Sequence, residues 1–197
     1  SNCDIQYVIP PQGTESPQKG LYNQLELIGI NEINQNLNWL FTNISSIYKE
    51  KIILMIPGVS KSGKDKQWPP ENFATLANTL EKEGYHICIV SQKSDKEVVE
   101  VIINACQEVT DLTDKSPPEI IYSIAKKSNF VISNDTGPGH IAALSNSPIL
   151  FLAKDNVLSK SNLSEYKNGF TILGNTMQSI SVKKVLDFLH KKKLINK

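Results

Sequence analysis

Cysteine is scarce in this sequence. The three that occur, Cys3, Cys88 and Cys106, are widely spaced, and none of them form a C-x-x-C pair. An odd count without a regular spacing argues against a disulfide framework and favours a reducing, intracellular environment. We therefore expect the fold to depend on an ordinary hydrophobic core, for which the 40% of hydrophobic residues is sufficient.

An excess of one charge is also absent, since the formal net charge is only +1. The whole molecule therefore has no general attraction for nucleic acid or an anionic membrane, and any attraction for anions must be local. No basic face with interleaved aromatic residues points to nucleic acid. No apolar run reaches the length of a membrane span, and no signal peptide is visible.

Residues 51–197 alternate apolar strand patterns with helical patterns. Strands are expected at 52–56, 85–90, around Val109, and at 129–133, 148–153 and 169–173, with helices at 71–84, 95–106, 116–127, 138–145 and 182–189. Continuous apolar strands between helices indicate a parallel sheet that is covered on both faces. We therefore predict an α/β fold, a Rossmann-like doubly wound sheet of six strands in the order 3-2-1-4-5-6. Its ligand crevice should lie beyond the carboxyl ends of strands one and four.

Residues 1–50 lack this regularity. Prolines mark an irregular opening, Leu21, Leu25 and Ile28 follow at helical spacing, and the polar stretch 31-NEINQNLN-38 comes next. We interpret residues 1–50 as a connector that packs on the main body, and residues 51–197 as the main domain.

Proline also marks two helix starts. The stretch 116-SPPE-119 predicts a capping box, in which Ser116 is the N-cap and Glu119 reaches back. Pro138 at a first helical position predicts Gly137 as the N-cap of the next helix. The backbone N–H groups of Gly139, His140 and Ile141 would then be free to bind an anion.

The loop 57-PGVSKSGKDKQWPP-70 contains a G-x-x-x-x-G-K pattern from Gly58 to Lys64, as in a nucleotide-binding P-loop. A P-loop needs Ser or Thr next, to ligate magnesium, and a helix directly after it. Here Asp65 follows, and Pro69-Pro70 delays the helix. A P-loop ATPase therefore fails its first requirement. Of the loop's cations, Lys66, beside Trp68, is a better candidate ligand than Lys61 or Lys64, which we expect to be solvated.

The loop 133-SNDTGPGH-140 follows strand four and should face the first loop across the crevice. Gly137 and Gly139 would let a ligand approach the backbone. Thr136 offers a hydroxyl, Asp135 an acceptor for sugar hydroxyls, and His140 either a donor to phosphate or a ring that holds the loop. Cations and free amides on facing loops suggest a diphosphate ligand. The alternative is a plain turn with a helix cap.

Asp95 follows strand two, where Rossmann-like sheets often place an acid on a ribose; the alternative is that it only starts its helix. Trp68 is expected in the core or as stacking support, and His86 in a structural role. His190 and 191-KKK-193 complement the dipole of the last helix, with a membrane-surface contact as the alternative.

Several motifs occur together in this chain: P-G with a small hydroxyl residue and a basic loop, K-x-W-P, N-F-x-x-L-A, D-L-T, and N-D-T-G-P-x-H-I-A-A. Over about residues 51–190 the chain resembles the carboxyl-terminal half of the bacterial ADP-heptose:lipopolysaccharide heptosyltransferases, which are glycosyltransferases of GT-B fold. The pair of K-x-W-P and D-T-G-P-x-H is quite specific, whereas either motif alone is weak.

The resemblance implies an inverting transfer of heptose from ADP-heptose to the lipopolysaccharide core. It needs no metal or cofactor and takes place in the cytoplasm or peripherally at the inner membrane. Ser60 and Lys66 would contact the diphosphate, Asp95 the nucleoside and Asp135 the heptose hydroxyls. The remaining donor-binding residues would form the phosphate-side loop: Thr136, Gly137, Gly139 and His140. The G-x-x-x-x-G-K match would be accidental.

The family's amino-terminal domain binds the acceptor and carries the general base, and residues 1–50 could supply only its tail. No residue of this chain is therefore assigned as the general base. A non-catalytic nucleotide-sugar binding module remains the alternative to a glycosyltransferase donor half, because the residues that would decide lie in that domain.

Overall fold

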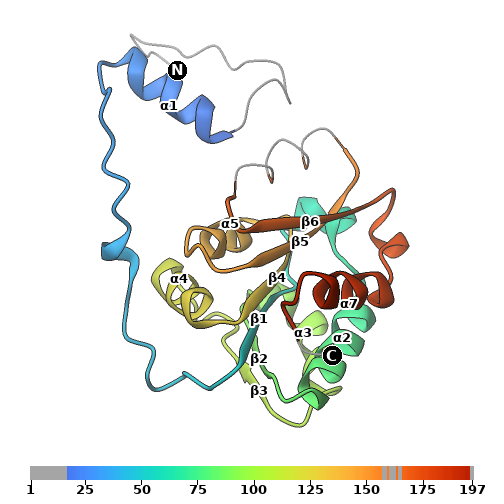
Figure 1. Cartoon of the computed structure of the whole chain (residues 1–197). Coiled ribbons are helices and arrows are strands. Elements are labelled where there is room, and N and C mark those ends of the chain that lie inside the picture. Colours follow the sequence, from blue (N-terminus) through green and yellow to red (C-terminus); the bar gives the residue numbers. More distant parts are fainter. Residues whose placement is uncertain (1–16, 157–158, 160–162, 164–165, 196–197) are drawn as a thin grey trace.

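A computed structural model describes residues 17–156, 159, 163 and 166–195, of which residues from Ile52 onward form a six-stranded parallel sheet (Figure 1). Its strand order is β3-β2-β1-β4-β5-β6, as predicted from the sequence. The strands are β1 (Ile52–Ile56), β2 (His86–Ile89), β3 (Val109–Asp111), β4 (Phe130–Asn134), β5 (Ile149–Lys154) and β6 (Gly169–Gly174). The helices are α1 (Pro17–Leu27), α2 (Pro70–Lys82), α3 (Lys96–Ile103), α4 (Pro118–Lys127), α5 (Gly137–Ala143) and α7 (Val182–Lys191).

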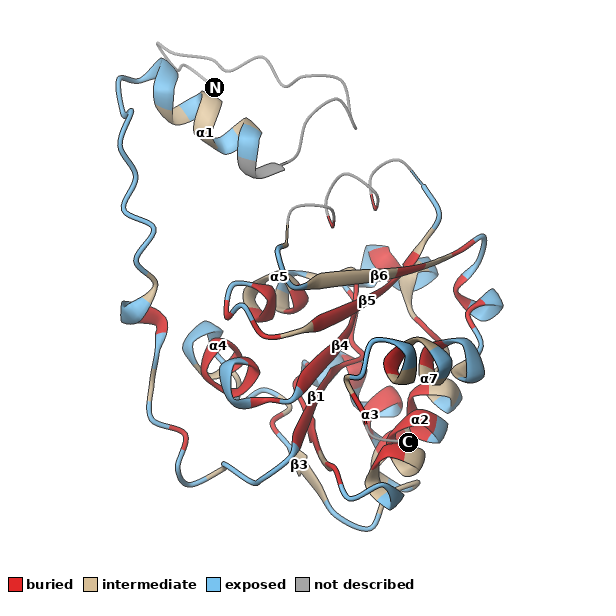
Figure 2. Ribbon diagram, viewed as in Figure 1, coloured by how far each residue is buried: buried red, intermediate tan, exposed pale blue. Residues whose placement is uncertain are grey.

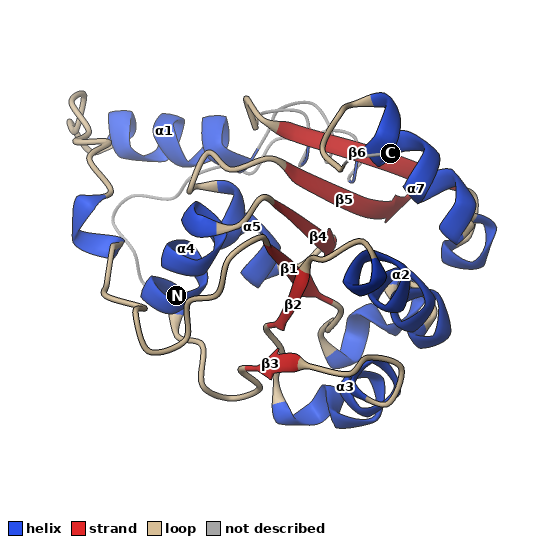
Figure 3. Ribbon diagram, turned by 60° about the horizontal axis from the view of Figure 1, so that its bottom comes forward, coloured by secondary structure: helices blue, strands red, loops and turns tan. Residues whose placement is uncertain are grey.

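Helices cover both faces of the sheet (Figure 3). On one face, Ile53 and Met55 of β1 pack in a core that includes residues of α2, α3 and α7. On the other face, Ile52, Leu54 and Ile56 pack with residues of α4 and α5. Because neighbouring side chains of a strand point to opposite faces, a strand covered on both sides must be apolar throughout, which is what the run 52–56 shows.

The connector packs on this body over only part of its length (Figure 2). Leu40 and Ile44 are buried, and the Thr42 backbone N–H donates to Ser123 Oγ of α4 at 2.8 Å. None of residues 19–39 is buried. The expected packing therefore holds at 40–44 and not at 19–39, because α1 carries too narrow an apolar stripe and the stretch after it is polar. The assignment of residues 1–50 to another domain stays a prediction.

The two predicted helix caps are wrong by one residue. The helix α4 begins at Pro118, so Pro117 is its N-cap and there is no side-chain cap bond; Ser116 Oγ instead donates to the Leu112 carbonyl at 3.1 Å. The helix α5 begins at Gly137, and its N-cap is Thr136. In the part of the chain described here, no helix has the length and apolar character that a membrane span requires.

Candidate functional site

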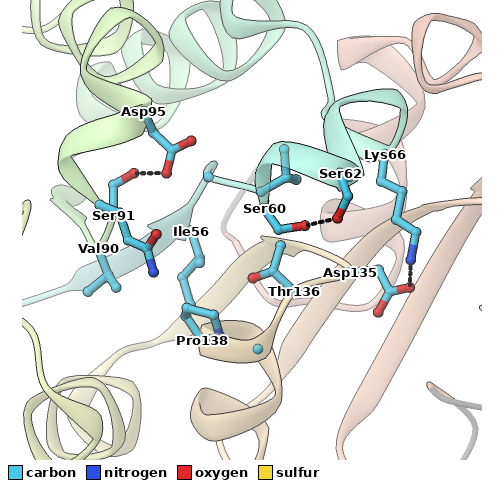
Figure 4. A pocket seen from close by; sticks show the side chains of 15 residues that line it. Ile56, Ser60, Ser62, Lys66, Val90, Ser91, Asp95, Asp135, Thr136 and Pro138 are labelled. Carbon is cyan, nitrogen blue, oxygen red and sulfur yellow. Dashed lines mark hydrogen bonds and ion pairs between the residues drawn. The ribbon is translucent and has the colours of Figure 1, made fainter.

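The two unusual loops meet, as predicted, at the carboxyl ends of β1 and β4. They enclose a cavity of about 440 Å³ together with residues that follow β2 (Figure 4). Six of the predicted site residues line this cavity: Ser60, Lys66, Asp95, Asp135, Thr136 and Gly137. Gly139 and His140 are not part of its lining. The topological switch point thus brings together predicted site residues that lie as many as 77 positions apart in the chain, from Ser60 to Gly137.

The loop after β1 does not have the structure of a P-loop. Residues Lys61–Lys66 form 3₁₀ turns, Gln67 is extended, and the next α-helix begins only at Pro70. Lys64 and Asp65 do not line the cavity. Asp65 instead pairs with Lys154 at the end of β5, at 2.8 Å, and this contact lowers the pKa of the Asp65 carboxyl. The G-x-x-x-x-G-K match therefore has no phosphate-cradling geometry.

Asn134, a residue that the sequence did not single out, fastens the two loops to each other. Its side chain is fully buried; Nδ2 donates to the Pro57 carbonyl at 2.8 Å, and Oδ1 accepts from the Trp68 backbone N–H at 3.1 Å. Trp68 is a core residue, as expected, and its indole N–H donates to the Ile180 carbonyl at 2.8 Å. Asn134 could have been suspected as a polar side chain at the end of a buried strand, next to Asp135.

Lys66 and Asp135 form an ion pair at the cavity (Figure 4), with Lys66 Nζ 3.6 Å from Asp135 Oδ2. Only 5% of the Asp135 side chain is exposed, and its other oxygen lies 3.3 Å from His140 Nε2. The hydrogen bond from His140, and then the charge of Lys66, lower the pKa of Asp135 against the opposing effect of burial. Asp135 is therefore held as a carboxylate whose two oxygens are both occupied by protein groups.

The amino end of α5 offers fewer free amides than predicted. The His140 N–H bonds to the Thr136 carbonyl at 3.1 Å, so it belongs to the helix, and Pro138 has no N–H. The backbone N–H groups that have no partner within the helix are therefore those of Gly137 and Gly139. Of these two residues, only Gly137 lines the cavity. The predicted anion site of three amides, from Gly139 to Ile141, is therefore wrong.

The two glycines of this loop have different roles. A Cβ on Gly137 would meet nothing within 4 Å, so a ligand can approach the backbone there. A Cβ on Gly139 would lie 2.4 Å from Ser133 Oγ and 3.0 Å from Phe151 Cε1. Gly139 is thus required by the close packing of α5 on β4 and β5, and its predicted role in admitting a ligand is wrong.

Asp95 is buried at the floor of the cavity with one free oxygen. Its Oδ2 accepts from Ser91 Oγ at 3.2 Å, whereas Oδ1 has no partner among the described residues. It occupies the N-cap position of α3 but makes no side-chain cap bond, so the helix-start alternative does not explain it. Gly58 makes room for it, because a Cβ there would lie 2.3 Å from Asp95 Oδ2. The hydroxyl of Thr136 is likewise buried without a partner in the described structure.

The charges of the cavity are mixed. The chain contains no arginine, and among the described residues Lys66 is the only basic side chain in the lining, against the two carboxylates of Asp95 and Asp135. Buried polar atoms without a hydrogen-bond partner lower the stability of the ligand-free protein. The arrangement therefore suits a ligand with one anionic part near Lys66 and hydroxyl donors near Asp95.

Comparisons with known proteins identify the relatives of this chain. The family model described as glycosyltransferase family 9 (heptosyltransferase) matches residues 21–184. The lipopolysaccharide core heptosyltransferase OpsX of Haemophilus influenzae is 30% identical over 108 residues, which cover 53% of this chain and 30% of OpsX. Lipopolysaccharide heptosyltransferase 2 of Escherichia coli is 27% identical over 145 residues, which cover 69% of this chain and 39% of that protein.

Solved structures show the same fold. E. coli ADP-heptose lipopolysaccharide heptosyltransferase II superposes with a TM-score of 0.65 at 21% identity, over 81% of this chain and 55% of that one. The family 9 glycosyltransferase of Veillonella parvula gives 0.64 at 20% identity, over 98% of this chain and 56% of that one. The chain therefore spans about half the length of these structures and about a third of the curated relatives that it matches. From the extent of the family match and the shared fold, the chain belongs to glycosyltransferase family 9, the heptosyltransferase family.

Proposed function

We propose that this chain is the donor-binding half of a glycosyltransferase that transfers heptose from ADP-heptose, with inversion, to the lipopolysaccharide core. The observation that carries the proposal is the cavity between the K-x-W-P and D-T-G-P-x-H loops, which is lined by Lys66, the unpartnered Thr136 hydroxyl and the unpartnered Asp95 carboxylate oxygen. A related E. coli enzyme, the heptosyltransferase WaaC, has been solved with ADP and with ADP-2-deoxy-2-fluoro heptose.

In this proposal the diphosphate lies near Lys66, Ser60 and the Gly137 amide, which are cavity residues with cationic or donor groups. The free oxygen of Asp95 accepts from the hydroxyls of the nucleoside ribose. Asp135 accepts hydrogen bonds from heptose hydroxyls once its contact with Lys66 or with His140 is broken. Because charge develops on the leaving diphosphate, a fixed ammonium and amide beside it stabilise the transition state without a metal or cofactor.

The acceptor hydroxyl must lose its proton to a base within roughly 3 Å. We propose that this base, and the site for the lipopolysaccharide core acceptor, belong to an amino-terminal domain of the kind that the longer relatives have room for. The reaction would take place in the cytoplasm, with peripheral contact at the inner membrane. A nucleotide-sugar binding module without catalysis is the second candidate, because the cavity alone would serve both.

Calorimetric titration with ADP, GDP and UDP tests donor binding, with Lys66→Ala beside the wild type. Lys64→Ala is the matched control, since Lys64 lies in the same 3₁₀ turns but outside the cavity. We expect selective ADP binding that weakens about 10- to 100-fold in Lys66→Ala, the loss of one charge-assisted bond, and is unchanged in Lys64→Ala. Equal losses in both variants, or no nucleotide binding at all, would contradict the donor site.

A further inference from the structure

Three aromatic rings pack together behind the cavity, on the far side of Asp135. The His140 ring lies 5.6 Å from Phe151 and 5.7 Å from Tyr166, and Phe151 and Tyr166 stack at 5.8 Å with an interplanar angle of 27°. Gly139 makes this packing possible, because a side chain there would collide with Phe151. Tyr166 lies just before β6, outside the motifs that identify the family.

A chain of polar contacts runs from this cluster to the cavity. Tyr166 OH lies 2.7 Å from His140 Nδ1, His140 Nε2 lies 3.3 Å from Asp135 Oδ1, and Asp135 Oδ2 lies 3.6 Å from Lys66 Nζ. An ionised carboxylate can only accept, so Nε2 must carry a hydrogen. In the neutral ring Nδ1 then has only a lone pair, and the Tyr166 hydroxyl must donate to it. With a neutral His140 ring, Tyr166 thus donates to His140 and His140 donates to Asp135, while Lys66 donates to Asp135 from its other side.

We propose that Tyr166 is a positioning residue of the donor site, which holds the His140 ring in place and, through it, the orientation of Asp135 toward Lys66. The role in donor binding rests on the function proposed above; the effect on His140 and Asp135 does not. Without the Tyr166 hydroxyl, the ring loses the 2.7 Å hydrogen bond that anchors Nδ1. The ring can then turn, the 3.3 Å contact from Nε2 to Asp135 weakens, and Asp135 is released from its present orientation.

A purely packing role for Tyr166 predicts something different. The variant Tyr166→Phe keeps the ring, and with it the stacking on Phe151 and His140, and removes only the hydroxyl. If Tyr166 served the core alone, this change would leave the contact of His140 with Asp135 untouched. The substitution therefore separates the two roles in a protein that remains folded.

The first measurement is the contact of His140 with Asp135, read from side-chain ¹H–¹⁵N correlations of the ligand-free protein at pH 8.5, where free imidazole is neutral. The chain has only three histidines, and His86 and His190 variants assign the spectrum. We expect a downfield Nε2–H proton for wild-type His140, the sign of a hydrogen bond to a carboxylate, and an upfield shift of this proton in Tyr166→Phe. Thr110→Val is the matched control: it removes the 2.7 Å partner of His86 Nε2 and should change His86 alone. An unchanged His140 in Tyr166→Phe would overturn the proposal.

The second measurement is binding of ADP and of ADP-heptose to both proteins. We expect the affinity for ADP-heptose to fall about tenfold in Tyr166→Phe, within the range for a charge-assisted bond, and the affinity for ADP to fall less, since Asp135 is proposed to hold the sugar. If the Nε2–H signal of His140 changes and the two affinities fall equally, the link from Asp135 to the sugar is wrong. If wild type binds neither ligand, the proposed function fails, and the spectrum still decides the role of Tyr166.

Discussion

At the scale of single residues, Asp135 gives the clearest test of the site in the ligand-free protein. Because its pKa is lowered in the folded state, its stabilising effect is present above the ordinary pKa of about 3.9 and is lost as the pH falls through the folded value. Asp135→Asn should therefore be about 1–3 kcal/mol less stable than wild type at pH 7, and the difference should shrink below about pH 4. Urea unfolding across this pH range measures it.

The control for this prediction is Asp65→Asn. Asp65 also has a lowered pKa, but it lies on the surface, 63% exposed, in its pair with Lys154. Solvent screens such pairs, so this variant should change stability little at any pH. A difference between wild type and Asp135→Asn that stays constant from pH 7 to pH 3 would show that the two contacts of Asp135 are not ionic.

At the scale of elements, the seating of α5 on the sheet can be tested with two neighbouring glycines. Gly139→Ala should destabilise the protein by about 1–3 kcal/mol, the usual cost of overpacking, because its Cβ would meet Ser133 and Phe151. Gly137→Ala, two residues earlier in α5 and with open space around it, should be neutral or stabilising. The melting temperatures of the two variants, measured by thermal unfolding, test this order of stability. The reverse order would mean that α5 does not sit against β5 as described.

The same helix shows how far sequence reasoning reaches. Strand order and the meeting of the two loops were predictable, because apolar periodicity and the handedness of crossovers depend only on local pattern. The role of Gly139 in α5 was not predictable, because it depends on Phe151, which lies twelve residues later in the chain, on β5. The contacts of His140 with Tyr166 and of Asn134 with Pro57 and Trp68 were missed for the same reason: each partner is brought close only by the fold.

At the scale of the whole molecule, apolar exposure is concentrated in one part of the described chain. Eight of the nine exposed large hydrophobic residues fall within residues 21–48: Leu21, Leu27, Ile28, Ile30, Ile33, Trp39, Phe41 and Tyr48. Leu40 and Ile44, in contrast, are buried, and Ile44 joins the core on the face of the sheet that α4 and α5 cover. The sheet and its helices should therefore form the cooperative folding unit, to which residues 19–39 contribute little.

Limited digestion with a glutamate-specific protease tests this division. Glu26 and Glu32 lie exposed at the end of α1 and after it, whereas Glu97 and Glu100, though also exposed, are held in α3. Cleavage should therefore occur first after Glu26 and Glu32, because a protease needs the chain locally extended. The fragment that begins at Ile33 should keep the melting temperature of the intact chain and its ADP affinity within about twofold. Mass spectrometry identifies the cuts, and calorimetry compares the two proteins. A fragment that unfolds, or loses nucleotide binding while the intact chain retains it, would show that the segment removed by the cut supports the cavity, although none of residues 19–32 is buried.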